Sequence, residues 1–137
     1  MITLIMGKKG SGKTKRLIDM CNAATAESKG SVVFIEKDTT LTYDISRQAR
    51  LAVAEDYAIT GYDAFYGFIA GMCASNYDIT DIFVDSTLKI GGGVEGLLGF
   101  VEKLKKLSDM ANTNVVLSVS AAQDEIPAEI ADLAKEI

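Results

Sequence analysis

The sequence predicts one α/β domain, residues 1–137, built as three α/β/α layers around a mainly parallel sheet of about five strands. Short apolar runs of strand length alternate with segments of helical periodicity along the whole chain. The run at residues 31–35 lacks polar alternation, as expected for a strand that is covered on both faces. No linker, internal repeat or low-complexity segment interrupts the 137 residues.

The first predicted strand is the apolar run at residues 2–6, and the first predicted helix runs from about Lys13 to Lys29. Gly30 is expected to end this helix as its C′ residue. The second predicted strand, residues 31–35, is rich in β-branched side chains and leads into the acidic segment Glu36-Lys37-Asp38.

The middle of the chain begins with the polar residues 39–48, where one helical turn is expected near Asp44. Residues 50–54 are the next strand candidate. Between Phe65 and Cys73, apolar side chains recur at i, i+3, i+4, i+7 and i+8, which predicts an amphipathic helix. On another face of that helix we expect a neighbouring element, most simply the sheet, to pack closely against two glycines, Gly67 and Gly71.

A third apolar run, residues 81–85, predicts a strand that ends in a carboxylate, and a loop is expected over residues 86–93. An amphipathic helix with Leu97, Val101, Leu104 and Leu107 on its apolar side follows and is expected to close at Asn112-Thr113-Asn114. Residues 115–120 are the last predicted strand. Pro127 suits the first turn of a final helix. The apolar side of that predicted helix consists of Ile130, Leu133, Ala134 and Ile137.

The segment between the first strand and the first helix matches the P-loop pattern G-x-x-x-x-G-K-[ST]. Its residues are Gly7, Lys8, Lys9, Gly10, Ser11, Gly12, Lys13 and Thr14. The glycines allow backbone N–H groups to turn toward a phosphate, and the helix N-terminus adds partial positive charge. Lys13 is expected to reach the β- and γ-phosphates, and the Thr14 hydroxyl to ligate Mg²⁺. The motif therefore predicts a nucleotide-phosphate site, against the alternative of an ordinary glycine-rich turn.

Composition excludes several kinds of function. The 19 acidic residues exceed the 14 basic ones, and the net charge of −5 argues against a large nucleic-acid or anionic-membrane footprint. The absence of histidine removes His bases, His-assisted nucleophiles and His-ligated metals. Cys21 and Cys73 are expected to be buried free thiols in a reducing compartment. With no targeting segment and no apolar stretch of membrane-spanning length, a cytoplasmic protein without a membrane partner is expected.

The predicted strand ends place polar side chains near the P-loop, because ligands of such sheets bind at the carboxyl ends of the strands. Asp85 follows an apolar run, as a Walker B aspartate does, and is expected to hold Mg²⁺ directly or through water. The alternative is an aspartate that caps a turn. Asp81, at the other end of the same strand, is expected to be structural.

Two of these strand ends resemble the core of RecA-like ATPases. Phe34-Ile35-Glu36-Lys37-Asp38 has the form of the family's acidic second strand, and Val84-Asp85-Ser86 has the form of its Walker B segment. The resemblance implies ATP and Mg²⁺ as ligands, a water-activating carboxylate at Asp38 or Glu36, and a Mg²⁺-associated carboxylate at Asp85. Lys13 belongs to the same implied catalytic set.

The chain departs from that family in three places. Asp38 stands where the family has the longer glutamate, and Ser120-Ala121-Ala122 stands where its last strand ends in a polar sensor. The DNA-binding loops and polymerisation segment are absent, with only Gly91-Gly92-Gly93 in the first loop's place. Recombination is therefore not implied.

A second resemblance, to deviant Walker A ATPases, depends on Lys8, which occupies the position of their signature lysine. Those proteins use that lysine to reach the partner's nucleotide across a dimer. Lys9, however, stands where they have glycine, and this chain is shorter.

The leading hypothesis is a Mg-ATP-binding switch, with weak or partner-activated hydrolysis, that acts on a protein partner or as a homo-oligomer. A small-molecule or nucleotide kinase is one alternative, although the arginines all lie within the first 50 residues and no lid-length insertion is present. A GTPase is disfavoured by the absence of an Asn-Lys-x-Asp motif. A non-hydrolysing nucleotide sensor or adaptor is the remaining alternative.

Overall fold

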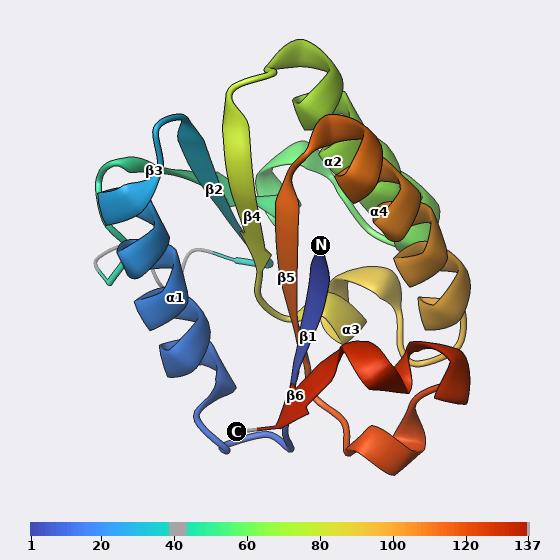
Figure 1. Ribbon diagram of the computed structural model, residues 1–137. Helices are drawn as coiled ribbons and strands as arrows, with labels where there is room; N and C mark the ends of the chain where they lie inside the picture. Colours follow the sequence, from blue (N-terminus) through green and yellow to red (C-terminus); the bar gives the residue numbers. More distant parts are fainter. Residues whose placement is uncertain (39–43, 137) are drawn as a thin grey trace.

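The computed structural model describes residues 1–38 and 44–136, and its centre is a six-stranded sheet (Figure 1). The strand order is β3-β2-β4-β5-β1-β6, and each neighbouring pair is parallel. In chain order the strands are β1 (Ile2–Met6), β2 (Ser31–Glu36), β3 (Ala49–Val53), β4 (Ile79–Val84), β5 (Asn114–Val119) and β6 (Ala134–Glu136). The predicted α/β class with a mainly parallel sheet is confirmed, and the predicted number of strands is one too few.

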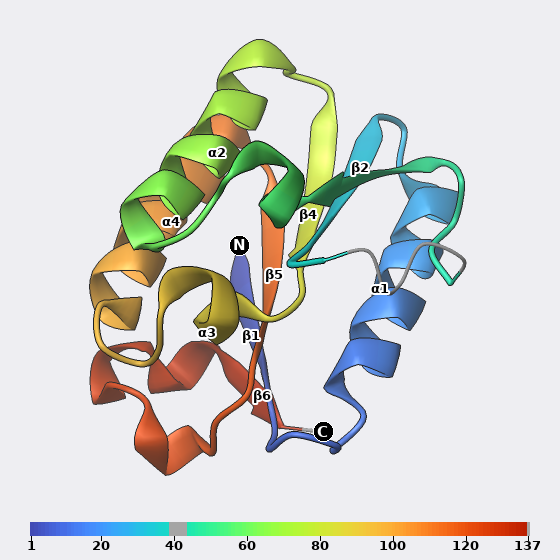
Figure 2. The same ribbon diagram turned by 180° about the vertical axis from the view of Figure 1, so that it is seen from behind.

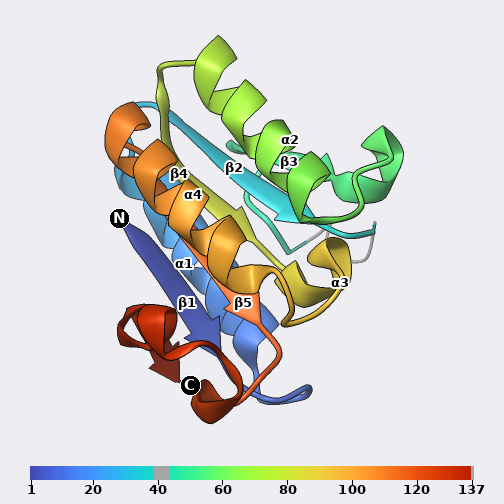
Figure 3. The same ribbon diagram turned by 90° about the vertical axis from the view of Figure 1, so that its right-hand side faces the viewer.

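Helices cover both faces of this sheet (Figure 3). The long helices are α1 (Lys13–Glu27), α2 (Tyr62–Ser75) and α4 (Leu97–Ala111). Strand β2 has apolar side chains buried on both faces of the sheet. Its residues Val32 and Phe34 pack in the cluster with α1, whereas Val33 and Ile35 pack in the cluster with α2 and α4. Because successive strand side chains alternate between faces, an uninterrupted apolar run is what a doubly covered strand requires.

The face with α2 and α4 carries the larger apolar cluster. Phe65 of α2 and Phe100 of α4 stack there with ring centroids 4.7 Å apart, and both side chains are buried. Stacked aromatic pairs add about 1 kcal/mol to the stabilisation from burial alone. In the described part of the chain, no helix has both the length and the apolar composition needed to cross a membrane.

The predicted end of the first helix is wrong. Helix α1 ends at Glu27, and Ser28 follows in extended conformation. Gly30 has a different role, because a Cβ at this position would overlap the carbonyl oxygen of Asp78. Close approach of two backbones, and not helix termination, therefore explains this glycine.

The predicted helical turn near Asp44 is not found in the described part of that segment, and residues 39–43 lie outside the described residues. Residues 44–48 form turns instead. The side chain of Asn22 on α1 donates to the carbonyl of Asp44 and accepts from the N–H of Ser46. An amide that binds backbone groups in this way offers them an alternative to helical hydrogen bonds.

Two further predictions fail in the second half of the chain. A short helix, α3 (Thr87–Gly91), lies in the predicted loop. The predicted final helix is replaced by two 3-10 helices, η2 (Gln123–Glu125) and η3 (Ala128–Leu133), followed by β6. Strand β6 pairs with the outer edge of β1, with Ala134 opposite Leu4. Backbone pairing along this otherwise open edge outweighs the weak helical periodicity of the segment.

The close packing predicted at Gly67 and Gly71 is also wrong. Both glycines are exposed, and a Cβ at either position would meet no atom within 4 Å. The side of α2 that carries them faces away from the sheet, so neither residue is explained by a close neighbour within the described residues.

Replacing Gly67 or Gly71 by alanine should therefore stabilise the protein. An exposed glycine inside a helix costs about 0.5–1 kcal/mol relative to alanine, because its backbone loses more conformational freedom on folding. Thermal and urea unfolding of Gly67→Ala and Gly71→Ala measure the gain. As the matched control, Gly91→Ala should destabilise, since its Cβ would overlap the Tyr62 ring. A loss of stability in Gly67→Ala would contradict the exposed placement of this face.

Candidate functional site

The P-loop segment forms a tight connection between β1 and α1 at the carboxyl edge of the sheet. Gly10 and Gly12 have φ angles of +84° and +93°, which residues with a side chain rarely adopt. The N–H of Ser11 donates to the carbonyl oxygen of Lys8 at 3.0 Å, closing the turn. A Cβ at Gly7 would overlap the Ser11 hydroxyl. The conformation of this loop therefore favours glycine at positions 10 and 12, and the space beside Ser11 favours it at position 7.

The N-terminus of α1 opens directly onto this loop. The first hydrogen bond of the helix runs from the N–H of Arg16 to the carbonyl of Gly12 at 3.1 Å. The N–H groups of Lys13, Thr14 and Lys15 therefore have no partner within the helix, and no side chain caps the helix at Gly12. Unpaired N–H groups together with the helix dipole make such a terminus suited to an anion.

The Thr14 hydroxyl and the Asp85 carboxylate meet although 71 positions separate them. Thr14 Oγ1 lies 3.3 Å from both carboxylate oxygens of Asp85. The Ser118 hydroxyl donates to Asp85 Oδ1 at 2.7 Å, and the N–H of Ser86 donates to Ser118 Oγ at 3.0 Å. The three elements meet because β5, which carries Ser118, lies between β1 and β4 in the sheet. Asp85 is consequently held in one orientation beside the P-loop.

The chain turns sharply after this carboxylate. Ser86 has φ +62° and ψ +41°, the left-handed conformation, at a position without glycine. For an ordinary residue this conformation costs about 1–2 kcal/mol. The strained turn brings the Ser86 N–H to Ser118 and leads directly into α3, and such strain concentrates at functional sites.

The donor atoms here fit Mg²⁺ bound together with phosphate. Thr14 and Asp85 supply a hydroxyl and a carboxylate, the oxygen ligands that this cation prefers. Among residues 1–38 and 44–136, no three His, Cys, Asp or Glu side chains cluster as a metal site. Mg²⁺ typically keeps several waters and binds through one or two carboxylates plus substrate phosphates, so a single aspartate is sufficient.

Lys13 is the buried cation of the site, with 7% of its surface exposed. Its Nζ donates to the carbonyl of Lys8 at 3.2 Å. Burial lowers the pKa of Lys13 below that of an ordinary lysine, the nearby Asp85 carboxylate opposes this shift, and the positive charge of Lys89 adds to it. The ammonium is therefore partly desolvated and close to both charges.

A pocket of about 420 Å³ connects these groups. Its lining residues are Lys9, Gly10, Lys13 and Thr14 from the P-loop side, Lys37 and Asp38 after β2, Asp85, Ser86 and Lys89 after β4, and Ser120 after β5. The structure thus brings Asp38 to the pocket with the P-loop and Asp85. Glu36, the alternative catalytic residue, is 2% exposed at the end of β2 and does not line the pocket.

The Lys8 side chain is exposed and does not line the pocket, and only its carbonyl takes part in the loop. None of the three arginines lines the pocket either. Asp81, expected to be structural, accepts hydrogen bonds from Thr80 and Asn114. The cations that face the pocket are all lysines.

From the sequence, Ser118 is expected only as one of the polar residues at the carboxyl ends of the strands, and Lys89 only as one of the basic residues that could reach a neighbouring molecule's nucleotide. Ser118 is 2% exposed and lies in β5 among apolar residues. A polar residue within an apolar strand was the sequence signal that could have identified Ser118. Because a loop is predicted over residues 86–93, no sequence pattern places Lys89 beside the pocket. Thr87 and Ile90, both buried and spaced as one helical turn, were the available signal for α3.

Lys37 of the pocket forms an ion pair with Glu55 at 2.8 Å, and this contact raises the pKa of Lys37.

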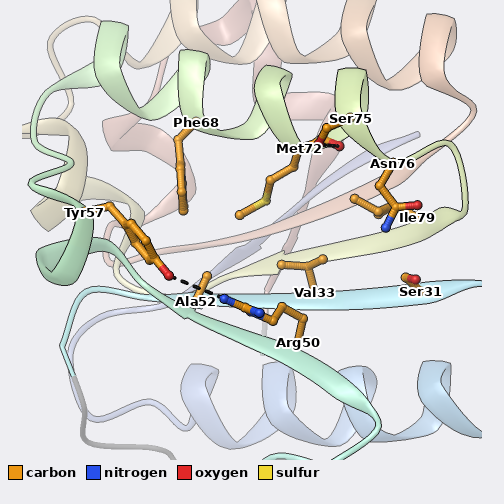
Figure 4. A pocket seen from close by; sticks show the side chains of 10 residues that line it. All are labelled: Ser31, Val33, Arg50, Ala52, Tyr57, Phe68, Met72, Ser75, Asn76 and Ile79. Atoms are coloured by element: carbon orange, nitrogen blue, oxygen red, sulfur yellow. Dashed lines mark hydrogen bonds between the residues drawn. The ribbon is translucent and has the colours of Figure 1, made fainter.

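A second cavity, of about 480 Å³, lies between α2 and the β2–β3 side of the sheet (Figure 4). Phe68 and Met72 reach down from α2 toward apolar side chains of the strands. Arg50 borders one end, where it donates to the hydroxyl oxygen of Tyr57 at 3.4 Å. Among the residues that line this cavity none belongs to the P-loop, and the lining is mostly apolar, so this cavity is not part of the candidate phosphate site.

The two cysteines take no part in either arrangement of polar groups. Both are free and buried, as predicted from their positions in the sequence. Burial raises the pKa of the Cys21 thiol to about 11, with Asp81 adding to the shift, and burial also raises the pKa of Cys73. Both thiols are therefore protonated at neutral pH.

Comparison of the sequence with protein-family models and with curated proteins gave no match.

Proposed function

We propose that this chain is a P-loop nucleotide-binding domain that binds ATP with Mg²⁺ and has the three-layer P-loop NTPase fold with a RecA-like core. The observation that carries the proposal is the meeting of Thr14, Asp85 and Ser118 at the N-terminus of α1. A glycine-rich turn alone would explain neither the oriented carboxylate nor the buried lysine beside it. Helices on both faces of a parallel sheet support the fold.

Each residue of the pocket has a chemical role in this proposal. The free N–H groups at the start of α1 and the Lys13 ammonium bind phosphate oxygens. Thr14 and Asp85 would hold Mg²⁺, and Ser118 keeps the Asp85 carboxylate turned toward Thr14. The bound cation would offset the phosphate charge. Asp38, which lines the pocket, would accept a proton from the attacking water.

We further propose that hydrolysis is weak or partner-activated, so that the protein acts as a nucleotide-dependent switch, as a homo-oligomer or with a protein partner. The proposed setting is the cytoplasm, in keeping with two free thiols. The choice of ATP over other nucleotides depends on the RecA-like resemblance.

Two alternatives retain a supporting observation. A non-hydrolysing sensor is favoured by the short Asp38 side chain in place of the family's glutamate. A deviant Walker A dimer is favoured by the Lys8 side chain, which is exposed and does not line the pocket of its own chain. A nucleotide kinase gains less support, because the pocket contains no arginine to bind the transferred phosphoryl group.

Calorimetric titration with ATP, in Mg²⁺ and in EDTA, tests the proposal. We expect binding that Mg²⁺ strengthens in the wild type, and an Asp85→Asn variant that binds ATP in EDTA but gains little from Mg²⁺. The amide keeps the shape of Asp85 and loses the charge that attracts the cation. Asp81→Asn, on the same strand, is the matched control and should respond to Mg²⁺ as the wild type does. Absence of ATP binding in the wild type would refute the proposal.

A further inference from the structure

Helix α3 is held at a defined place beside the pocket. Its residue Ile90 is buried, and the carbonyl of Ile90 accepts a hydrogen bond from the N–H of Gly61 at 2.8 Å. The Tyr62 hydroxyl donates to the carbonyl of Gly93, and a Cβ at Gly91 would overlap the Tyr62 ring. The Gly91-Gly92-Gly93 segment thus fastens α3 to the start of α2. Figure 2 shows α3 between the carboxyl end of β4 and α2.

Lys89 is the charged residue that this helix presents to the pocket. It lies next to the buried anchor Ile90, its own side chain is exposed, and it lines the pocket together with Lys13 and Asp85. No hydrogen bond or ion pair is recorded for Lys89 within residues 1–38 and 44–136. Lys89 and Lys13 therefore present two positive charges to one pocket.

The other lysines of the pocket are placed differently. Lys13 donates to the P-loop backbone, and Lys37 is paired with Glu55 at 2.8 Å. Lys9 belongs to the P-loop itself. Lys89 alone among the pocket lysines comes from the chain that follows the Asp85 strand. Two ammonium groups in one pocket repel, and a phosphate bound between them would relieve that repulsion.

We propose that Lys89 binds the terminal phosphate of a nucleoside triphosphate and gives the site its preference for triphosphate over diphosphate. This inference rests on the proposed function, because it assumes that the P-loop holds the preceding phosphates. A diphosphate, bound by the P-loop, would leave Lys89 without its partner. A triphosphate adds a further negative group on the side of the pocket that Lys89 lines. Charge-assisted hydrogen bonds of this kind are about twice as strong as neutral ones.

The test compares binding of a slowly hydrolysed ATP analogue, ATPγS, with binding of ADP, both with Mg²⁺, by calorimetry. Lys89→Ala should weaken ATPγS binding about 10-fold or more and change ADP binding by less than about threefold. Lys89→Arg should keep much of the wild-type preference, since the charge remains. Lys105→Ala, an exposed lysine of α4, removes the same charge outside the pocket and should leave both affinities unchanged.

The outcomes separate the two proposals. Wild type that binds neither nucleotide refutes the proposed function and this inference with it. Wild type that binds both nucleotides equally, or a Lys89→Ala variant that keeps the wild-type ratio, overturns the role of Lys89 while nucleotide binding stands. Equal weakening of both ligands by Lys89→Ala also overturns it, because that result indicates general electrostatic attraction.

Discussion

Replacing Lys13 by methionine is expected to weaken Mg-ATP binding by about 100-fold, because removing one partner of a buried, hydrogen-bonded charge pair costs about 2–5 kcal/mol. Methionine keeps the length and apolar stem of the side chain, so the loss reports on the ammonium. Lys13 is the most deeply buried cation at the N-terminus of α1, where the phosphates are proposed to bind.

The same substitution should leave the free protein at least as stable as the wild type. Burial places the pKa of Lys13 in the folded state below its value in the unfolded chain. The unfolded chain therefore binds more protons at pH values between the two, and this group makes stability rise with pH in that window. At pH values below the lowered pKa, Lys13 is charged in the folded state, and the desolvation of that charge destabilises the fold. Removing the ammonium at neutral pH therefore removes this destabilisation.

This opposition between binding and stability is the feature to measure. Calorimetry reports the affinity, and urea unfolding at neutral pH reports the free energy of unfolding. Lys15→Met is the matched control, because Lys15 lies two residues on, is largely exposed, and pairs with Asp19 at 3.1 Å. The interpretation is wrong if Lys13→Met unfolds more readily than Lys15→Met, or if both variants bind Mg-ATP equally well. ATP affinity of the wild type should also fall as the pH is raised through the lowered pKa of Lys13.

The part of the site that sequence predicts well is the part whose chemistry is local. Gly10 and Gly12 adopt conformations that favour glycine, and Lys13 and Thr14 follow within the same turn, so one segment specifies the geometry. Asp85 could be placed near it by a general rule, because the carboxyl ends of parallel strands share an edge. In the structure Thr14 Oγ1 lies 3.3 Å from both carboxylate oxygens of Asp85.

The rest of the site depends on strand order, which short patterns do not specify. Ser118 binds Asp85 because β5 lies between β1 and β4, and no feature of residues 115–120 reveals that placement. Lys89 faces the pocket because α3 is fastened to Tyr62, a contact between segments about 30 residues apart. Long-range contacts also explain β6, where pairing with β1 overrides the helical spacing of residues 130–137 in its described part.

The choice between Asp38 and Glu36 as the proposed water-activating carboxylate depends both on a local pattern and on long-range contacts. The strand-end pattern indicated Asp38 or Glu36 without choosing between them. Glu36 is the last residue of β2, opposite Val53 in the register, and it is almost completely buried. The chain beyond it is held by Glu55, whose N–H donates to the Lys37 carbonyl at 3.1 Å and whose carboxylate pairs with the Lys37 ammonium. These two contacts position the segment so that Asp38 lines the pocket.

Asp38→Asn should therefore lower the single-turnover rate of ATP hydrolysis by about 100-fold or more, the size expected for loss of a general base. Mg-ATP affinity should change little, because an ionised carboxylate has no hydrogen-bond donor to offer a phosphate oxygen. Glu36→Gln makes the same chemical change two residues earlier and is the matched control. Its hydrolysis rate should remain near that of the wild type, provided that circular dichroism shows an intact fold.

Rapid-quench measurements with enzyme in excess of radiolabelled ATP separate the chemical step from product release. A wild-type rate retained in Asp38→Asn but lost in Glu36→Gln would transfer the catalytic role to the buried carboxylate. Binding without hydrolysis in the wild type, at every protein concentration, would instead favour the sensor alternative. In that case Asp38→Glu is the next variant to measure. It lengthens the side chain by one methylene, to that of the glutamate in RecA-like ATPases, and should raise hydrolysis above the background rate.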